Sequence, residues 1–225
     1  MNIGGIQKFS LLDYPDKIAT IIFTNGCNFR CGYCHNPELV NKPYQNILSQ
    51  EEIVAFLKKR VGKLEAVSIT GGEPLLQKDL LQFLKTVKKL GFFTKIDTNG
   101  SFPKRLKTII NSKMIDYVSM DIKTSLKKYQ TLIKKQINPN DILESIRIIL
   151  ASEIKHEFRT TLVAGLLSSE DILEIMELIK GANIYYLQRF KKSKHLDVSF
   201  LKSETFDENE IRKLLKVDIV KTVCR

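Results

Sequence analysis

The chain alternates short β-branched runs with amphipathic stretches, and this alternation constrains its fold more than any other feature. Six runs rich in Ile, Val, Phe and Thr predict strands, and apolar residues at helical spacing between them predict helices. With right-handed crossovers, such a chain builds a parallel sheet covered by helices. Six units are too few for a closed eightfold barrel. We therefore expect an α/β fold, a partial (β/α)6 TIM barrel with outer helices, rather than a flat doubly wound sheet.

The pattern places each element along the chain. The expected strands are Ile18–Thr24, Ala66–Thr70, Phe93–Asp97, Tyr117–Asp121, His156–Val163 and Ile184–Phe190. The expected helices are Ser49–Val61, Lys78–Leu90, Pro103–Ser112, Asn140–Ala151, Ser169–Lys180 and Asp207–Lys216. Ser49 and Glu52 form a capping-box pattern, and Pro103 suits a first helical turn. Gly91 and Gly181 stand where helices should end.

A chain of 225 residues is long enough for one domain with a continuous core. We expect a single domain over residues 1–225, with an N-terminal extension over about 1–16 and a core over about 17–190. A C-terminal helix and tail would follow over about 191–225. No repeat, low-complexity run or linker interrupts this organisation.

The chain is basic, with a formal net charge of +11. A positive surface suits nucleic acid, an acidic protein or an anionic cofactor, and the sign alone does not choose among them. Most basic pairs fall in the last turns of expected helices, where cations complement the helix dipole. Lys191, Lys192 and Lys194 instead cluster in an expected loop and form a candidate docking patch.

The first residues lack the charged start and apolar run of a signal peptide, and no stretch reaches the roughly 18 apolar residues of a spanning helix. We therefore expect a cytoplasmic protein. Because that compartment is reducing, its four cysteines indicate metal or redox chemistry rather than disulfides. Three of them lie close together, and Cys224 stands alone near the end of the chain.

The expected strands run into glycines and polar residues, at the edge where parallel α/β folds gather their chemistry. One such segment alone is typical of a plain turn, but several in succession indicate a functional edge. In chain order the segments are Gly26–Cys34, Gly71–Pro74, Asp97–Gly100, Asp121–Lys123, the strand residues Arg159 and Thr161, and Gln188–Phe190.

Cys27, Cys31 and Cys34 are spaced C-x3-C-x2-C on one short loop. Three thiolates at this spacing can bind one face of an iron–sulfur cube and leave the fourth iron without a protein ligand. An electron-transfer cluster would normally take four cysteines. The spacing therefore predicts a [4Fe–4S] cluster with one open iron.

Two other metal sites fit part of this loop. Cys31 to His35 has the C-x-x-C-H pattern of covalent haem attachment, which would leave Cys27 without a role. A structural zinc site could use the three cysteines and His35, although the adjacent Cys34 and His35 would bind one ion with strained geometry. Haem and zinc remain the alternatives to the iron–sulfur cluster.

These residues resemble the radical S-adenosylmethionine (SAM) superfamily, whose signature is a C-x3-C-x2-C loop with an aromatic residue, here Tyr33, before the last cysteine. The segment Gly71–Pro74 is similar to that superfamily's GGEP segment. The runs Gly4–Ser10, Asp13–Pro15 and Gly26–Pro37 resemble glycyl-radical-enzyme activases, most closely the activating proteins of anaerobic ribonucleoside-triphosphate reductases. The resemblance is dense up to about residue 123 and thinner beyond.

The resemblance implies that the methionyl amine and carboxylate of SAM bind the open iron. Tyr33 would then lie against the adenine. Gly71 and Gly72 would let the backbone approach the amine, and Glu73 would help to hold it. In all, the resemblance implies that nine residues bind SAM: Tyr33, Gly71, Gly72, Glu73, Asp97, Thr98, Asn99, Lys123 and Arg159.

Among the charged members, Asp97 would contact the methionyl end and Lys123 its carboxylate, while Arg159 could bind carboxylate or ribose oxygens. Asp97, Thr98 and Asp121 could also hold a monovalent cation, as in some relatives. The plainer interpretation is a surface ion pair between Asp121 and Lys123, and a solvated strand residue for Arg159.

The chain departs from some activases in two ways. It has no histidine in the segment Leu187–Phe190, where some relatives carry one near the end of the sixth strand. It also has no cysteine between Cys34 and Gly71, so no further cluster is expected there.

The resemblance implies an anaerobic radical SAM oxidoreductase that cleaves SAM reductively and generates a glycyl radical on a partner enzyme, expected to be an anaerobic ribonucleotide reductase. Catalysis would need no residue beyond the cluster and SAM, and a flavodoxin- or ferredoxin-type protein would donate the electron. We expect neither membrane nor nucleic acid as a partner. One alternative keeps the cofactors but acts on a small molecule, as 7-carboxy-7-deazaguanine synthases do. Another, from a different class, is a zinc-stabilised basic RNA-binding module.

Overall fold

The computed structural model describes residues 1–41, 44 and 48–225. Its sheet contains eight strands in the order β1 to β8, the order in which they occur along the chain. A doubly wound sheet would reverse that order at a switch point, so the winding is that of a barrel. The six expected strands are present as β2 (Ala19–Thr24), β3 (Ala66–Gly71), β4 (Phe93–Thr98), β5 (Tyr117–Asp121), β6 (Lys155–Leu162) and β7 (Tyr185–Arg189). The α/β fold with a mostly parallel sheet is confirmed.

The six expected helices are also present. They are α2 (Gln50–Lys58), α3 (Leu80–Lys89), α4 (Pro103–Asn111), α6 (Pro139–Leu150), α7 (Ser169–Leu178) and α8 (Glu208–Leu215). Their ends follow the local chemistry of the sequence. Ser49 and Glu52 form the expected capping box at the start of α2. Gly91 and Gly181 adopt positive φ angles of 87° and 91° just after α3 and α7, a conformation that favours glycine.

Two strands were not predicted. β1 (Ile3–Ser10) pairs antiparallel with β2, and it occupies about half of the segment expected as an N-terminal extension. Gly4 and Gly5 conceal it in the sequence, because glycine has low strand propensity. β8 (Thr222–Cys224) pairs parallel with β7 and is too short for a periodic pattern. Two short helices, α1 (Pro37–Val40) and α5 (Tyr129–Ile133), were missed for the same reason of length.

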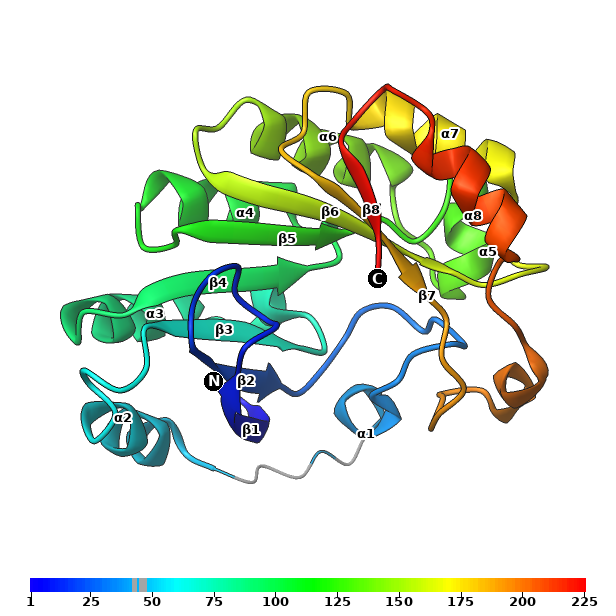
Figure 1. The fold of residues 1–225 in the computed structure, drawn as a ribbon. Coiled ribbons are helices and arrows are strands. Elements are labelled where there is room, and N and C mark those ends of the chain that lie inside the picture. The colour runs from blue at the N-terminus through cyan, green and yellow to red at the C-terminus, as the bar shows by residue number, and fades with distance from the viewer. Residues whose placement is uncertain (42–43, 45–47) are drawn as a thin grey trace. The chain divides into compact units, whose positions relative to one another are not determined.

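The residue contacts divide the chain into two compact units, and Figure 1 labels the helices and strands that they contain. The boundary falls within β5. The first unit contains β1 to β4 with α2, α3 and α4, and comprises Met1–Asn28, Glu38–Thr98 and Lys104–Val118. The second unit contains β6 to β8 with α5 to α8, and comprises Phe29–Pro37, Asn99–Pro103 and Ser119–Arg225.

The first unit anchors the Asp13–Pro15 segment that the sequence singled out. Tyr14 is buried, and its ring lies 5.8 Å from the ring of Tyr117 and 6.4 Å from that of Phe93. Lys95, in the middle of β4, donates a hydrogen bond of 2.8 Å from Nζ to the carbonyl oxygen of Asp13. The segment is therefore held both by aromatic packing and by a buried cation.

Among the described residues, no helix has the length and apolar character needed to span a bilayer.

Candidate functional site

The carboxyl end of β3 approaches the start of the cysteine loop too closely for any side chain. Gly72 N donates to Thr24 O at 2.8 Å, and Glu73 N donates to Gly26 O at 2.7 Å. A Cβ on Gly72 would lie 2.0 Å from Gly26 O, and one on Gly71 would lie 2.4 Å from Thr24 N. Backbone packing alone therefore requires glycine at both positions, in addition to any contact with a ligand.

Glu73 joins the ends of two strands. Its side chain is fully buried, and Oε1 accepts hydrogen bonds from Leu75 N at 3.0 Å and from Thr98 Oγ1 at 2.8 Å. The first bond caps the short 3₁₀ helix Pro74–Leu76, and the second comes from the last residue of β4. Two of the predicted site residues, Glu73 and Thr98, are thus brought together with a fixed carboxylate orientation.

Asp97 is paired with a cation that the sequence analysis did not single out. Lys95 Nζ lies 3.1 Å from Asp97 Oδ1, and Lys95 is only 2% exposed. The sequence offered only a lysine within an expected strand, and the structure shows that five of the six residues of β4 are buried. Because a buried charge is stable only when paired, Lys95 holds Asp97 in position.

Asn99 shapes the turn that follows β4. Its Oδ1 accepts hydrogen bonds from Ser101 N at 3.0 Å and Ser101 Oγ at 2.6 Å, the arrangement of an Asx turn. Gly100, with φ of 76°, fits against Met120, whose Cε would lie 2.0 Å from an added Cβ. The amide of Asn99 is therefore engaged in local structure.

The second unit gathers three charged site residues. Arg159 Nε donates to Asp121 Oδ1 at 2.5 Å, and Lys123 Nζ donates to Asp121 Oδ2 at 3.0 Å. Arg159 is 9% exposed, which is unlike the solvated strand residue of the plainer interpretation. Lys123 and Asp121 are half-buried, so their pairing also differs from that of an exposed surface pair.

The charges in this group are strongly fixed. Burial alone would raise the pKa of Asp121, but the neighbouring Arg159 and Lys123 outweigh it and hold that pKa far below its usual range. Burial alone would lower the pKa of Lys123, but Asp121 outweighs it and raises that pKa well above its usual value. All three groups are therefore ionised at neutral pH. A second carboxyl group faces the same cations, since Glu157 Oε1 lies 3.8 Å from Arg159 Nη1, and the donors of Lys123 and Arg159 could also bind a ligand carboxylate.

Tyr33 lies in the same unit and has an unsatisfied hydroxyl. Its side chain is buried, and among the described residues its hydroxyl oxygen has no hydrogen-bond partner. Burial raises the pKa of Tyr33 well above its usual value, despite the nearby charge of Lys123. A buried hydroxyl without a partner is costly, so this atom is suited to a ligand group.

The three cysteines divide between the units. Cys27 belongs to the first, while Cys31 and Cys34 belong to the second, where Cys34 N donates to Cys31 O at 3.0 Å in a tight turn. Within the described part of the chain, no three His, Cys, Asp or Glu side chains are grouped so as to hold a metal ion. The soft thiol donors and the orphaned Tyr33 hydroxyl suit an iron–sulfur cluster with SAM, and the joining of the three thiols on one cluster stays a prediction.

The expected monovalent cation would compete with protein cations. Asp97 already faces Lys95, and Asp121 faces both Lys123 and Arg159. Thr98 directs its hydroxyl at Glu73.

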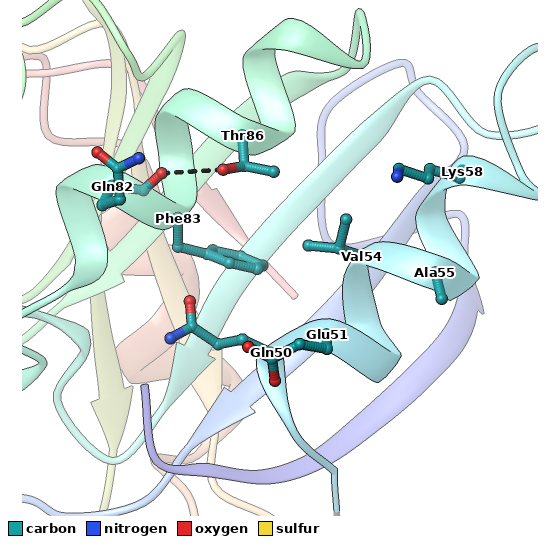
Figure 2. Close-up of a pocket in the computed structure, with 8 residues that line it drawn as sticks. All are labelled: Gln50, Glu51, Val54, Ala55, Lys58, Gln82, Phe83 and Thr86. Atoms are coloured by element: carbon teal, nitrogen blue, oxygen red, sulfur yellow. Dashed lines mark hydrogen bonds between the residues drawn. The ribbon is translucent and has the colours of Figure 1, made fainter.

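A groove in the first unit contains none of the predicted site residues. It measures about 380 Å³ and runs between α2 and α3, with Val54 and Phe83 at its apolar floor and Gln50 at its rim (Figure 2). Its lining has no cluster of residues suited to catalysis.

Comparison with known proteins places the chain in a family. The Radical SAM superfamily model matches residues 21–179. A protein of Methanocaldococcus jannaschii, provisionally named a glycyl-radical enzyme activating enzyme, is 35% identical over 223 residues, which cover 96% of this chain and 90% of that protein. The pyruvate formate-lyase-activating enzyme of Clostridium pasteurianum is 36% identical over 126 residues, covering 54% of this chain and 52% of the enzyme.

Two further likenesses are more distant. A GTP 3',8-cyclase of Campylobacter jejuni subsp. doylei is 30% identical over 216 residues, covering 91% of this chain and 65% of the cyclase. The crystal structure of Streptococcus suis SuiB superposes with a TM-score of 0.69 at 18% identity, covering 91% of this chain and 48% of SuiB. That likeness supports the fold alone. Family membership implies a [4Fe–4S] cluster and SAM as cofactors. The chain belongs to the radical SAM superfamily.

Proposed function

We propose that the protein is an activase, a radical SAM enzyme that generates a glycyl radical on a partner enzyme. The observation that carries this proposal is the 35% identity to the Methanocaldococcus jannaschii protein over nearly the whole of both chains. The similarity to a pyruvate formate-lyase-activating enzyme, over about half of each chain, supports the same class of reaction. The substrate would then be the Cα–H bond of a glycine in the partner protein.

The proposed partner is an anaerobic ribonucleoside-triphosphate reductase. Support comes from the three sequence runs that resemble activating proteins of those reductases. In the structure the run Gly4–Ser10 lies entirely within β1, and Asp13–Pro15 is anchored by Lys95 and Tyr117. These runs therefore occupy ordered positions in the first unit.

The cofactor ligands are proposed from the chemistry of the residues. Cys27, Cys31 and Cys34 would hold the cluster, which, once reduced, supplies the electron for homolytic cleavage of SAM and so a carbon radical that abstracts hydrogen. Tyr33 would accept the adenine against its ring. The protein's part is to orient the reacting groups and to exclude other hydrogen donors.

The charged site residues are proposed to bind the methionyl group of SAM. The buried carboxylate of Glu73 would bind the positively charged amine, assisted by Asp97. Lys123 and Arg159 would bind the carboxylate, since charge-assisted hydrogen bonds of this kind are strong and directional. No side chain need act as general acid or base in this scheme.

The electron donor is proposed to be an acidic flavodoxin- or ferredoxin-type protein in the reducing cytoplasm, because the chain carries a formal net charge of +11. Raising the ionic strength should slow reduction of the cluster by such a donor, since salt screens attraction between exposed charges. A reduction rate that does not change with salt would contradict an electrostatic docking mode.

The test is anaerobic incubation of the reconstituted, reduced protein with SAM and the reductase, observed by electron paramagnetic resonance. We expect a glycyl-radical doublet, and we expect Cys31→Ser to abolish it. Cys224→Ser is the matched control, because Cys224 lies in β8 outside the loop, and it should retain the signal. Cleavage of SAM without a doublet would contradict activation of this partner.

A second candidate is a radical SAM enzyme that acts on a small molecule. The match to a GTP 3',8-cyclase over 91% of this chain favours it, although the chain spans only 65% of that enzyme. Under this alternative, SAM cleavage would accelerate on adding a small substrate such as a nucleotide and would not require a protein partner. A nucleotide that leaves the rate unchanged would disfavour it.

A further inference from the structure

Residues 190–202 lie between β7 and α8, and we call this segment the strap (Figure 1). The strap binds the part of the cysteine loop from Gly32 to Cys34. Both belong to the second unit. Leu196 N donates to Cys34 O at 3.0 Å, and Asp197 N donates to Gly32 O at 2.9 Å. Tyr33 lies between Gly32 and Cys34, and its carbonyl oxygen is 3.2 Å from Nδ1 of His195. Three consecutive carbonyl oxygens of the loop are therefore bound by three consecutive residues of the strap.

The hydrogen bonds of His195 define its tautomer. Ser193 N lies 3.3 Å from Nε2, and a backbone N–H can only donate, so Nε2 must carry the lone pair. The proton of the neutral ring is then on Nδ1, which donates it to Tyr33 O. Since His195 is 6% exposed, water competes little for either nitrogen.

Ring packing fixes the plane of the His195 side chain. The Phe190 ring stacks on it at 5.0 Å with an interplanar angle of 20°, and the His35 ring lies 4.9 Å away. Phe200, from the strap, closes the other side of the loop, because an added Cβ on Gly32 would lie 2.4 Å from its ring. The histidine is thus held in one orientation against the peptide that separates Cys31 from Cys34.

From this geometry we infer that His195 is a positioning residue of the cysteine loop. Its Nδ1–H orients the Tyr33 peptide and thereby holds the Cys31 and Cys34 thiols in place before any metal is bound. His195 was not predicted from the sequence, in which only the preceding Lys191, Lys192 and Lys194 were singled out. The role given to His195 rests on the proposed function, in which the loop cysteines bind the cluster. The contact between His195 and Tyr33 O is present in the protein whether or not a cluster binds.

The structure offers a matched control. His156 is also buried, and it makes the same pair of contacts, with Nδ1 2.9 Å from Ile154 O and Nε2 accepting from Asn183 N at 3.3 Å. It lies at the start of β6, outside the strap and the cysteine loop. His195→Phe and His156→Phe therefore remove equivalent hydrogen bonds from buried aromatic positions.

The first experiment measures cysteine alkylation in the metal-free protein by mass spectrometry, with Cys224 as an internal reference. We expect His195→Phe to speed labelling of Cys31 and Cys34 relative to Cys224 by roughly fivefold, the change in an opening equilibrium that one neutral hydrogen bond produces. His156→Phe should leave this ratio unchanged. His195→Asn, whose amide can donate from near the position of Nδ1, should restore the slower labelling.

The second experiment measures the rate at which an iron chelator strips the reconstituted cluster. His195→Phe should lose iron faster than His156→Phe at equal thermal stability. Should His195→Phe fail to fold, His195→Gln, whose amide lies one carbon farther out, should give the same fast labelling while His195→Asn does not. Equal labelling ratios in the His195 and His156 variants, or no difference between Asn and Gln, would overturn the inference. If labelling changes as expected but no cluster forms in any variant, the proposed function fails and the positioning role stands.

Discussion

The two units hold their candidate site residues by different physical means. In the first, backbone segments touch at Gly72 and Gly26, and a buried hydroxyl from Thr98 fixes the Glu73 carboxylate. In the second, opposite charges at Asp121 and Arg159 fix one another. The first arrangement depends on shape and the second on charge.

This difference determines what each unit tolerates. Close-packed backbone has no room to adjust, so a single added methyl group must displace a strand end. A charged group can reorganise or bind water, but removing one partner leaves the other buried without compensation. Substitution of Gly72 in the first unit should therefore fail through sterics, and substitution of Arg159 in the second through uncompensated charge.

Gly72→Ala tests the steric arrangement and has the largest expected effect. Its Cβ would lie 2.0 Å from Gly26 O, so β3 and the cysteine loop must separate, at a cost of at least about 3 kcal/mol in the free energy of unfolding. Gly5→Ala is the control, because its Cβ would meet only Phe23 at an ordinary 3.8 Å. Urea unfolding checks both variants. Equal midpoints would show that the close approach is not needed.

Arg159→Met tests the charged arrangement. It leaves the half-buried Asp121 with Lys123 alone and removes a cation near Glu157, so we expect a loss of about 3 kcal/mol in unfolding free energy. Arg189→Met, on the neighbouring strand, breaks an exposed pair with Glu208 and should cost far less. Urea unfolding at neutral pH compares the two. If the Arg159 variant is as stable as the wild type in 1 M salt, then Asp121, Lys123 and Arg159 behave as an exposed ion-pair network that salt screens, and the charged arrangement is not a buried one.

The strands and helices were predictable because each leaves a local pattern. β5 begins and ends where periodicity placed it, at Tyr117 and Asp121, and the capping box at Ser49 marked the start of α2. β1 was missed because its strand character comes from pairing with β2, while Gly4 and Gly5 argue locally against it. Tertiary pairing overrides weak local propensity in such cases.

The candidate site was predictable in its composition but not in its internal contacts. The strand ends indicated Glu73 and Thr98, and the structure joins them with a hydrogen bond. Lys95 and His195 were missed because their partners, Asp13 O and Tyr33 O, are backbone atoms distant in sequence. A side chain that binds a backbone carbonyl across the fold leaves no sequence motif.

Asp171 extends the comparison to pH. Burial alone would raise its pKa, but hydrogen bonds from Lys128 and Ser125 outweigh it and lower the pKa to about 2. Because the folded pKa lies below the unfolded pKa of about 3.9, ionised Asp171 stabilises the protein above pH 4. This stabilisation is lost as the pH falls toward 2. We expect Asp171→Asn to lose on the order of 2 kcal/mol at pH 7, with the difference from the wild type shrinking below pH 4.

Thermal unfolding between pH 3 and 7 measures this dependence. Glu153→Gln, at an exposed carboxylate, is the control and should follow the wild type throughout. A deficit in Asp171→Asn that stays constant over this pH range would mean that the carboxylate acts through packing, which would weaken the contrast between shape and charge.

Thr98→Val is the smallest change and acts within the first unit. It keeps the shape of the side chain but removes the donor to Glu73 Oε1, so we expect a loss of about 1.5 kcal/mol, typical of one hydrogen bond to a charged group. Thr86→Val is the isosteric control on α3, where the hydroxyl bonds only to Gln82 O at the surface (Figure 2), and it should change stability by less than about 0.5 kcal/mol. Under the proposed function, only Thr98→Val should also weaken SAM binding to the reconstituted protein, since a less constrained Glu73 would bind the amine less well. If SAM affinity is unchanged while stability falls, the Thr98 bond supports the fold of the first unit and not the ligand.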